Sequence, residues 1–302
     1  MVPELGRASL KMTWTLSGAS KSAVRTGLQM GPFNLDMGHS VFHTWHAVLL
    51  SHGHGDHIFS VGSLFFVDQS VDKKGRPLER YVFAERKTLA RVRRYAGALM
   101  QLNFETDSKL GLPATFVSAD VKPDDEPYVV NINKDIFHVV VRKLSHRVTS
   151  VGYYVSKTST NLNEEFRLLK AQMTTKEFGV LVKKSRALGM GVTKTTAVPQ
   201  FCFMTDTTIK GIRDNMDLAC RYPIIICECT FYHIDDIDHA ERKSHTHWTT
   251  LLPHILATPN SLWVLIHSST RYTYLEDVFS AVASTGTEIP SNCLVWLADK
   301  PT

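Results

Sequence analysis

The chain has 302 residues, of which 43% are hydrophobic and 21% are charged, and this composition excludes intrinsically disordered, collagen-like and coiled-coil proteins. Its length allows one large domain or two ordinary ones. Lys and Arg number 34 and Asp and Glu number 29, so the net charge of +5 is compatible with an anionic partner but does not establish one. The 14 histidines, several of them clustered, are the most informative part of the composition.

The cysteines and the first residues indicate the cellular environment. The five cysteines form no C-x-x-C pair and no regular spacing, which favours scattered reduced thiols over a disulfide framework. The N-terminal residues lack the apolar run of a signal peptide, and no stretch approaches the roughly 20 apolar residues of a membrane span. We therefore expect a soluble, cytoplasmic protein that does not bind a membrane.

Short apolar strands alternate with helical patterns along the chain, which is typical of an α/β protein. In chain order, the sequence predicts strands at 33–37, 47–50 and 80–84, a helix at 87–102, strands at 128–133 and 136–141, a helix at 163–171, a strand at 200–205, a helix at 208–217, a strand at 224–227, a helix at 247–257, a strand at 262–266, a helix at 274–283 and a strand at 294–297.

Two polar segments look like insertions into this pattern. Residues 106–126 carry prolines near their ends, and residues 157–197 are basic. The charges of the second segment fit either a solvated helix face or a surface that contacts an anion. No long linker divides the chain, so we expect a single domain over residues 1–302, in which 157–197 is a candidate substrate-contacting insertion.

The sharpest motif is the S-H-G-H-G-D-H run at residues 51–57, which directly follows the apolar strand at 47–50. Three imidazoles and one carboxylate lie within six residues, and the glycines between them let the loop turn tightly. In extended backbone His52 and His54 point the same way, whereas Asp56 and His57 lie beyond the turn, where they can serve a second ion. These ligands suit zinc, and suit manganese or iron less well. The motif therefore predicts a metal centre.

This run resembles the H-x-H-x-D-H signature of the metallo-β-lactamase superfamily, and residues 14 to 275 together resemble its tRNase Z branch of RNA-processing phosphodiesterases. Three further motifs follow in that family's order: His146 before a Gly-Tyr pair, Asp206 between two threonines, and His267 in a Leu-x-His-x-Ser-x-Arg-Tyr run. The resemblance implies a metallo-β-lactamase-type four-layer αβ/βα sandwich, with metals bound at one edge.

The resemblance also implies how the ligands divide between two zinc ions, with manganese as the alternative metal. The seven implied ligands are imidazoles and carboxylates: His52, His54 and His146 for one ion, Asp56, His57 and His267 for the other, and Asp206 for both. Such a set leaves an open position for water, as a catalytic site requires. Two ions about 3.5–4 Å apart can acidify a shared water and neutralise charge on a phosphoryl oxygen.

A Glu-x-Thr-Phe run at Glu228 and a His-Thr pair at His245 match the motif that separates the RNA-processing branch from the β-lactamases. The resemblance implies that His245, held in one tautomer by Glu228, is the general acid that protonates the departing alkoxide. Asp56 is a further catalytic candidate, as acceptor of the proton of the attacking water. His247 replaces a threonine of the family and is the one nearby substitute if His245 is displaced. Asp36 is implied as a support for the metal loop rather than a ligand.

These motifs leave several functions open. The first is a dizinc endoribonuclease that trims the 3′ end of precursor tRNA. The segment 157–197 lacks the Gly/Pro-rich hairpin of the family's tRNA-gripping arm, which keeps a cyclic-nucleotide phosphodiesterase as an alternative. A nucleic-acid-binding relative without catalysis is disfavoured because all ligands and the acid pair are present, and β-lactam hydrolysis because neutral lactams do not need that pair. Relatives are commonly dimers, so a homodimer is expected by analogy.

Two further basic groups have ordinary interpretations. No carboxylate cluster accompanies three histidines at helical spacing before the metal motif, so they are expected to line the pocket rather than bind a third metal: His39, His43 and His46. Three arginines on the helix expected at 87–102 are assigned to a solvated face rather than to a phosphate track: Arg91, Arg93 and Arg94.

Overall fold

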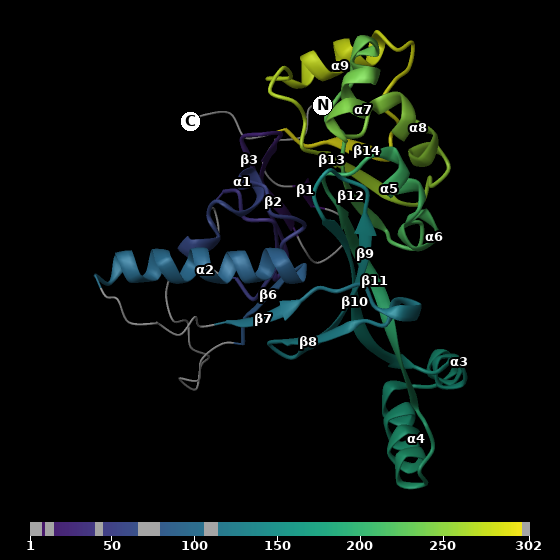
Figure 1. Ribbon diagram of the computed structural model, residues 1–302. Helices are drawn as coiled ribbons and strands as arrows, with labels where there is room; N and C mark the ends of the chain where they lie inside the picture. The colour runs from purple at the N-terminus through teal and green to yellow at the C-terminus, as the bar shows by residue number, and fades with distance from the viewer. Residues whose placement is uncertain (1–7, 10–14, 40–44, 66–78, 106–113, 298–302) are drawn as a thin grey trace.

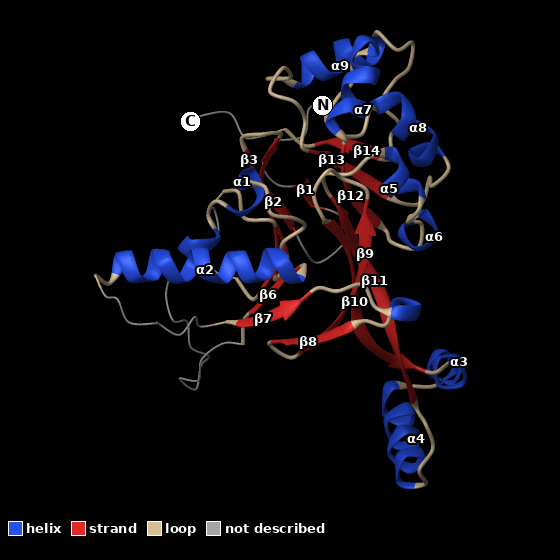
Figure 2. Cartoon of the chain, in the orientation of Figure 1, coloured by secondary structure: helices blue, strands red, loops and turns tan. Residues whose placement is uncertain are grey.

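Two seven-stranded sheets face each other in the computed structural model, which describes residues 8–9, 15–39, 45–65, 79–105 and 114–297 (Figure 1). Helices cover the outer face of each sheet, so that the layers run helix, sheet, sheet, helix (Figure 2). The four-layer αβ/βα sandwich that the family resemblance implies is therefore confirmed. No helix within these described ranges is long and apolar enough to cross a membrane.

The first sheet begins as an antiparallel hairpin and continues as parallel strands. Its strands pair in chain order: β1 (Ala8–Ser9), β2 (Thr15–Lys21), β3 (Arg25–Met30), β4 (Phe33–Leu35), β5 (Ala47–Leu49), β6 (Tyr81–Ala84) and β7 (Thr115–Ser118). The short α1 (Gly55–Ile58) follows β5, while η1 (Val61–Phe65) and the long α2 (Arg86–Asn103) pack on the outer face. Parallel pairing from β4 to β7 puts the carboxyl ends of those strands at one edge.

The second sheet is antiparallel from β8 to β11 and parallel from there to β14. Its strands also pair in chain order: β8 (Tyr128–Ile132), β9 (Asp135–Leu144), β10 (Ser150–Leu162), β11 (Thr193–Met204), β12 (Ile224–Glu228), β13 (Leu262–Ile266) and β14 (Cys293–Val295). Four helices pack on its outer face: α5 (Ile209–Arg213), α6 (Met216–Ala219), α8 (Trp248–Leu256) and α9 (Leu275–Ala283). The remaining short helices lie in connections: η2 (Pro123–Asp125), η3 (Ile234–Asp236) and α7 (Ile237–Lys243).

The main core lies between the two sheets, where apolar side chains from both inner faces meet. Phe33 of β4 packs edge-to-face on Phe137 of β9, with ring centroids 5.1 Å apart. Burying one such ring contributes about 1.5–3 kcal/mol. The hydroxyl of Tyr153 in β10 also crosses this core and donates to the carbonyl oxygen of Leu50 at 2.7 Å. This hydrogen bond ties the second sheet to the end of β5, from which the His-rich loop departs.

The inserted segment 157–197, which we call the arm, projects away from the sandwich (Figure 1). It consists of the outer ends of β10 and β11, which stay paired as far as Leu162 and Thr193, and of the helices α3 (Glu164–Gln172) and α4 (Thr175–Ala187). The pairing register shifts next to Pro199 of β11, a residue that cannot donate to a strand ladder and is therefore typical of a bulge. The outer part of β11 is exposed and that of β10 is half-buried or exposed, which agrees with their polar composition.

Three predictions about the elements need correction. Part of the supposed insertion 106–126 is the edge strand β7, while residues 106–113 lie outside the described residues. The single helix predicted at 208–217 is two helices, because the side-chain amide of Asn215 donates to the carbonyl oxygen of Gly211 at 2.7 Å at the break. The β2–β3 hairpin is missing from the predicted elements because Ser20 and Thr26 are buried and hydrogen bonded to each other, which hides the usual alternation.

Candidate metal centre

Seven candidate ligands converge at the edge where the carboxyl ends of strands from both sheets meet. The loop at 51–57 leaves β5 and enters α1, while the other candidates follow β9, β11 and β13. Parallel strand ends bring together residues that are far apart in the chain, which is why this edge is the usual site of α/β proteins. The structure places next to one another all seven residues that the sequence singles out: His52, His54, Asp56, His57, His146, Asp206 and His267.

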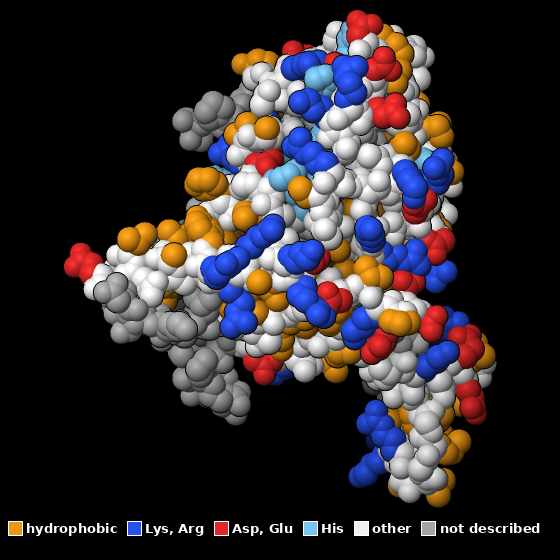
Figure 3. All heavy atoms as spheres, viewed as in Figure 1, with side chains coloured by type: hydrophobic (Ala, Val, Ile, Leu, Met, Phe, Trp, Pro, Cys, Tyr) orange, Lys and Arg blue, Asp and Glu red, His pale blue; other side chains and the backbone are white. Residues whose placement is uncertain are grey.

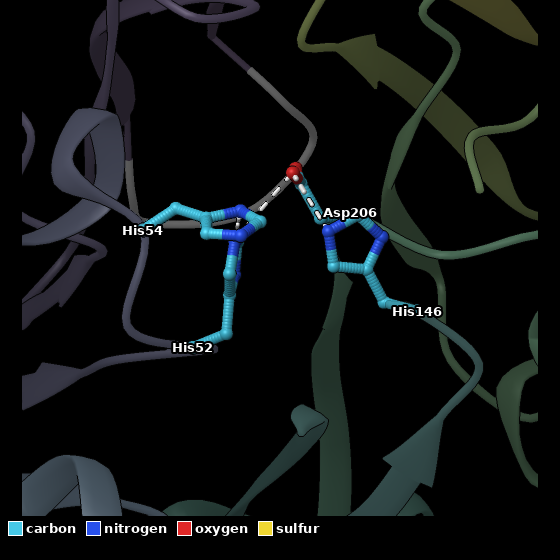
Figure 4. A group of neighbouring side chains, drawn as sticks. All are labelled: His52, His54, His146 and Asp206. Atoms are coloured by element: carbon cyan, nitrogen blue, oxygen red, sulfur yellow. Dashed lines mark hydrogen bonds and ion pairs between the residues drawn. The ribbon is translucent and has the colours of Figure 1, made fainter. Parts of the chain in front are cut away.

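The first group consists of His52, His54, His146 and Asp206, whose ligand atoms all lie within 4.8 Å of one another. In Figure 4 the two histidines of the loop approach from one side and His146 from the other, and all three rings point toward the Asp206 carboxylate. The Oδ2 atom of Asp206 lies 3.5 Å from Nε2 of His52 and 3.8 Å from Nε2 of His146. This is a compact set of three nitrogens and one oxygen.

The second group consists of Asp56, His57 and His267, again within 4.8 Å. Nε2 of His57 and Nε2 of His267 lie 3.3 Å and 3.2 Å from Oδ1 of Asp206. Each carboxylate oxygen of Asp206 therefore faces one group, which is the arrangement that a bridging ligand requires.

The hydrogen bonds within the two groups show that these side chains fit cations. Nε2 of His146 is buried and has no hydrogen-bond partner within the part of the chain that the structure describes. Nε2 of His57 faces Nε2 of His267 at 3.3 Å, so two lone pairs converge with nothing but a proton or a cation to separate them. The opposite ring nitrogens are held by the protein: Ser51 Oγ on His52, Asp36 Oδ2 on His57, the Ser244 carbonyl on His146, and Thr230 Oγ1 on His267. Such support orients imidazoles for metal binding.

In the first group, burial and neighbouring charges favour the protonation states that bind metals. In the second group, the carboxylates of Asp206 and Asp36 outweigh burial and raise the pKa of His57, so that a cation would have to displace its proton. Burial lowers the pKa of the three imidazoles in the first group, which keeps them neutral. Burial would raise the pKa of Asp206, but attraction to the imidazoles of His267 and His57 outweighs it and holds that pKa well below its usual value. Neutral imidazoles and an ionised carboxylate are the forms that coordinate a cation.

Left-handed backbone conformations concentrate around this centre. Asp36, Asp206, Ser244 and His267 have φ values of 56°, 41°, 60° and 62°. A non-glycine residue in this region is strained and persists where the surrounding structure holds it in place. These conformations direct four groups toward the same point: the candidate ligands Asp206 and His267, the supporting carboxylate of Asp36 and the supporting carbonyl group of Ser244.

The predicted acid pair lies beside the two groups. Nδ1 of His245 lies 3.0 Å and 3.1 Å from the two carboxylate oxygens of Glu228, which is fully buried at the end of β12. Glu228 also accepts from the hydroxyl of Thr230 at 2.6 Å and from the backbone N–H of Thr207. Burial lowers the pKa of His245, but the Glu228 carboxylate outweighs it and raises the pKa to about 8. The ring of His245 also joins Asp206 and His267 in a third close group.

His247 is not a substitute for His245, because the two side chains face different surroundings. Nδ1 of His247 contacts the backbone N–H and hydroxyl of Thr249 at the start of α8, and its Nε2 lies 2.8 Å from the carbonyl oxygen of His233. Both ring nitrogens are therefore used in capping a helix and fixing a turn. His245 keeps the position next to Glu228.

The candidate ligands open into a cavity of about 580 Å³, which we call the metal pocket. Its walls differ in character: Val24 and Phe59 are apolar yet 54% and 72% exposed, whereas Arg147 on another side is cationic. Neither His39 nor His46 lines this pocket, contrary to the prediction from the sequence, and His43 lies outside the described residues. Arg91, Arg93 and Arg94 are all exposed, as the sequence predicts, and the guanidinium of Arg93 also lies 5.1 Å from the centroid of the Phe116 ring.

Some supporting residues could not be recognised beforehand. The hydroxyl and the backbone N–H of Ser51 both donate to the Asp36 carboxylate. The one feature of the sequence that points to this supporting role is the position of Ser51 directly before His52. Ser244 acts through a carbonyl group, for which no side-chain pattern exists. Asp36, in contrast, lies where the sequence predicts, 2.7 Å from Nδ1 of His57.

Comparisons with known proteins agree with this architecture. No protein-family model matches the chain. The chain is 26% identical to tRNase Z TRZ1 of Arabidopsis thaliana over 241 residues, which is 78% of this chain and 77% of that protein. It is 30% identical to the chloroplastic tRNase Z TRZ2 of the same plant over 151 residues, which is 48% of this chain and 39% of that protein.

Solved structures show the same fold at lower sequence identity. The human short-form tRNase Z superposes with a TM-score of 0.51 at 14% identity, over 84% of this chain and 92% of that one. The metallo-β-lactamase fold protein YhfI of Bacillus subtilis superposes with a TM-score of 0.50 at 14% identity, over 92% and 93% of the two chains. The His/Asp cluster is of the type that holds two metal ions in this fold. The chain therefore has the metallo-β-lactamase fold, carries a His/Asp cluster suited to metal ions, and is related in sequence to tRNase Z.

Proposed function

We propose that this protein is a two-zinc phosphodiesterase that cleaves RNA, and that its substrate is the 3′ end of precursor tRNA. The observation that carries the proposal is the buried Glu228–His245 pair directly beside Asp206. A phosphodiester releases an alkoxide, which needs a proton, and this pair supplies a proton donor at the place where the leaving oxygen would lie.

The metal roles follow the two groups of side chains. We assign the imidazoles of His52, His54 and His146 to one zinc. The other zinc would be held by Asp56, His57 and His267, and the Asp206 carboxylate would bind both ions. Imidazole and carboxylate ligands suit zinc, and manganese is the alternative. When bound, the two ions would lower the pKa of water and neutralise charge on the phosphoryl group.

The chain's own residues supply the proton transfers. Because the Glu228 carboxylate accepts a hydrogen bond from Nδ1 of His245, the exchangeable proton resides on Nε2, which is free to donate it to the leaving oxygen. A pKa of about 8 keeps that proton in place at neutral pH. Asp56, which lines the metal pocket, is the proposed acceptor of the proton from the attacking water.

Two features beyond the metal centre support an RNA substrate. The apolar wall with Val24 and Phe59 suits a nucleobase, and the cation of Arg147 suits a phosphate. The arm at 157–197 carries eight cations on an extended support, and we propose that it contacts the substrate through six of them: Lys170, Lys176, Lys183, Lys184, Arg186 and Lys194. The identity to TRZ1 of Arabidopsis thaliana, a tRNase Z, favours precursor tRNA over other RNAs.

A two-substrate assay tests the proposal. Purified protein is incubated with a precursor tRNA and, separately, with 3′,5′-cyclic mononucleotides, each with and without a chelator. We expect cleavage of the precursor near its 3′ end that is abolished by the chelator and restored by zinc. Cleavage of the cyclic mononucleotides alone would show a cyclic-nucleotide phosphodiesterase instead, and failure to cleave either would remove the proposed activity.

The role of His245 has its own test. His245→Ala should retain both metal ions by elemental analysis and slow turnover of the precursor by about 10²–10⁴-fold, because it removes the acid without removing a proposed ligand. His247→Asn is the matched control, since it removes the neighbouring imidazole while leaving a good helix cap. Wild-type turnover in His245→Ala would eliminate this residue as the acid.

A further inference from the structure

A second cavity, of about 340 Å³, opens beside the metal pocket. His54 and Arg147 line both cavities, so the two are neighbours across these side chains. Lys87 and Arg91 of α2 line the second cavity as well, and we call it the α2 cavity. It is therefore a basic recess in direct continuity with the place where the scissile phosphate would lie.

The charges of the α2 cavity are not balanced by carboxylates. Lys87, Arg91 and Arg147 are exposed, and none of them forms an ion pair with another of the described residues. Glu85 is the one carboxylate of the lining, and its Oε2 accepts from the backbone N–H groups of Lys87 and Thr88 at the start of α2. Three positive charges thus face one negative charge that already caps a helix.

A larger cavity on the other side of His146 provides an instructive contrast. It encloses about 720 Å³ and is lined by four cations, but three of these are already paired: Lys122 with Glu126, Arg142 with Asp125 and Asp217, and Lys210 with Asp214. An anion entering there would have to displace carboxylates. The smaller α2 cavity offers cations that need no such displacement.

We propose that the α2 cavity binds a second phosphate of the substrate strand, next to the phosphate that is cleaved at the metal pocket. Lys87 and Arg91 contact this second phosphate, and Arg147 lies between the two positions. In Figure 3 the Lys and Arg side chains gather between the N-terminal half of α2 and the pale-blue histidines, which is the path that such a strand would take. The inference rests on the proposed phosphodiesterase function and deepens it.

The proposal has a direct consequence for substrate choice. A polynucleotide presents phosphates on both sides of the scissile bond, whereas a dinucleoside monophosphate or a cyclic mononucleotide has one phosphate in all. Contacts to backbone phosphates add affinity without reading sequence. The α2 cavity therefore selects for chain length, independently of the bases.

The test measures the ratio of kcat/KM for a single-stranded octaribonucleotide to kcat/KM for a dinucleoside monophosphate, with the zinc-loaded full-length protein. The double variant Lys87→Gln/Arg91→Gln should lower this ratio about tenfold or more, because two charged contacts are lost. The log–log salt dependence for the octamer should also become shallower by about 0.7 per lost phosphate contact. Arg94→Gln is the control for a general charge effect, since it removes one positive charge from the same helix but lies outside the cavity lining.

The outcomes separate the two proposals. A wild-type enzyme without preference for the octamer, an unchanged ratio in the double variant, or an equal loss in Arg94→Gln would each overturn the second phosphate site while leaving the phosphodiesterase intact. If the wild type cleaves neither substrate, the proposed function fails instead. In that case, binding of a labelled octamer to the same variants, measured by fluorescence polarisation, still decides whether the α2 cavity binds a phosphate chain. The double variant should then bind the octamer at least about tenfold more weakly than the wild type.

Discussion

The first half of the molecule contains the first sheet, and the second half contains the second sheet. These two halves contribute to the metal centre in different ways. The first half places four candidate ligands in one six-residue stretch, His52 to His57, held by the end of β5 and by α1. The second half places Asp206, Glu228 and His267 at or just beyond the ends of three adjacent parallel strands, β11, β12 and β13. A loop motif is visible in the sequence by itself, whereas residues dispersed over strand ends become one site only through the sheet.

The supporting hydrogen bonds differ between the halves as well. His57 is held by a buried carboxylate, Asp36, at 2.7 Å. Its counterpart His267 is held by the hydroxyl of Thr230 at 3.1 Å, and that hydroxyl donates in turn to Glu228 at 2.6 Å. The first half therefore supports its ligand with a charge, and the second half with a neutral relay that also links the ligand to the acid pair.

The largest effect is expected where the two halves share a ligand, at Asp206. Asp206→Asn keeps the side-chain volume, and asparagine tolerates the left-handed φ of 41° better than other residues. It removes the charge whose two oxygens face the two groups. Metal content measured by elemental analysis should fall for both ions. Turnover of precursor tRNA should fall further than the loss of about 10–100-fold that is typical when a residue supporting a metal ligand is changed.

Asp124→Asn offers a control for Asp206→Asn, because it makes the same change at an exposed carboxylate that also has a left-handed φ, of 51°, and metal content should stay at the wild-type value. If Asp206→Asn loses the metal bound by one half and keeps the other fully, the carboxylate is not shared and the two groups are independent sites.

The next effect concerns the charged support in the first half. Asp36→Asn preserves shape and the left-handed φ of 56° but replaces the carboxylate that accepts from His57 and Ser51. Metal affinity should fall about 10–100-fold, because the imidazole loses the partner that fixes its orientation and raises its basicity. Competition with a graded chelator measures the change. Affinity equal to that of the wild type would show that the backbone alone positions His57.

A smaller effect is expected from the neutral support in the second half. Thr230→Val removes the hydroxyl between His267 and Glu228 without changing the volume much. Metal affinity should fall by about tenfold or less, since a neutral partner is lost instead of a charged one. Thr230→Ser keeps the hydroxyl and should restore the wild-type value in the same chelator titration. A loss as large as that of Asp36→Asn would erase the proposed difference between the halves.

The same contrast explains how much of the structure could be predicted from the sequence. The helix at 87–102 was predictable because its apolar residues recur with a clear period, and strands such as β5 and β13 were predictable because they are short continuous apolar runs. The outer ends of β10 and β11 were not, since both faces of these strands meet solvent and the sequence at 157–162 and 193–198 carries no alternation of burial. There the two strands are held together by the hydrogen bonds between them, without an apolar face that the sequence would reveal.

The site shows a corresponding limit. The ligands of the loop at 52–57 could be named from their own clustering, and His146, Asp206 and His267 could be named because their motifs resemble those of a known family. The α2 cavity could not, because Arg91 and Arg147 lie on different elements and sequence spacing says nothing of their proximity to His54. The carbonyl of Ser244 is equally invisible, since a backbone group acts there.

The smallest expected effect tests whether the first half depends on the second for its shape. Tyr153 of β10 donates to the Leu50 carbonyl, both buried, directly before the loop that carries the ligands. Tyr153→Phe leaves that carbonyl unpaired and should lower the free energy of unfolding by about 1–3 kcal/mol in a denaturant titration. Tyr154→Phe, which loses a hydroxyl that contacts the sulfur of Met204 on the other face of the strand, should cost less because sulfur is a weak acceptor. If both variants are equally destabilised, the hydrogen bond between the halves contributes nothing specific, and the loop is positioned by the first sheet alone.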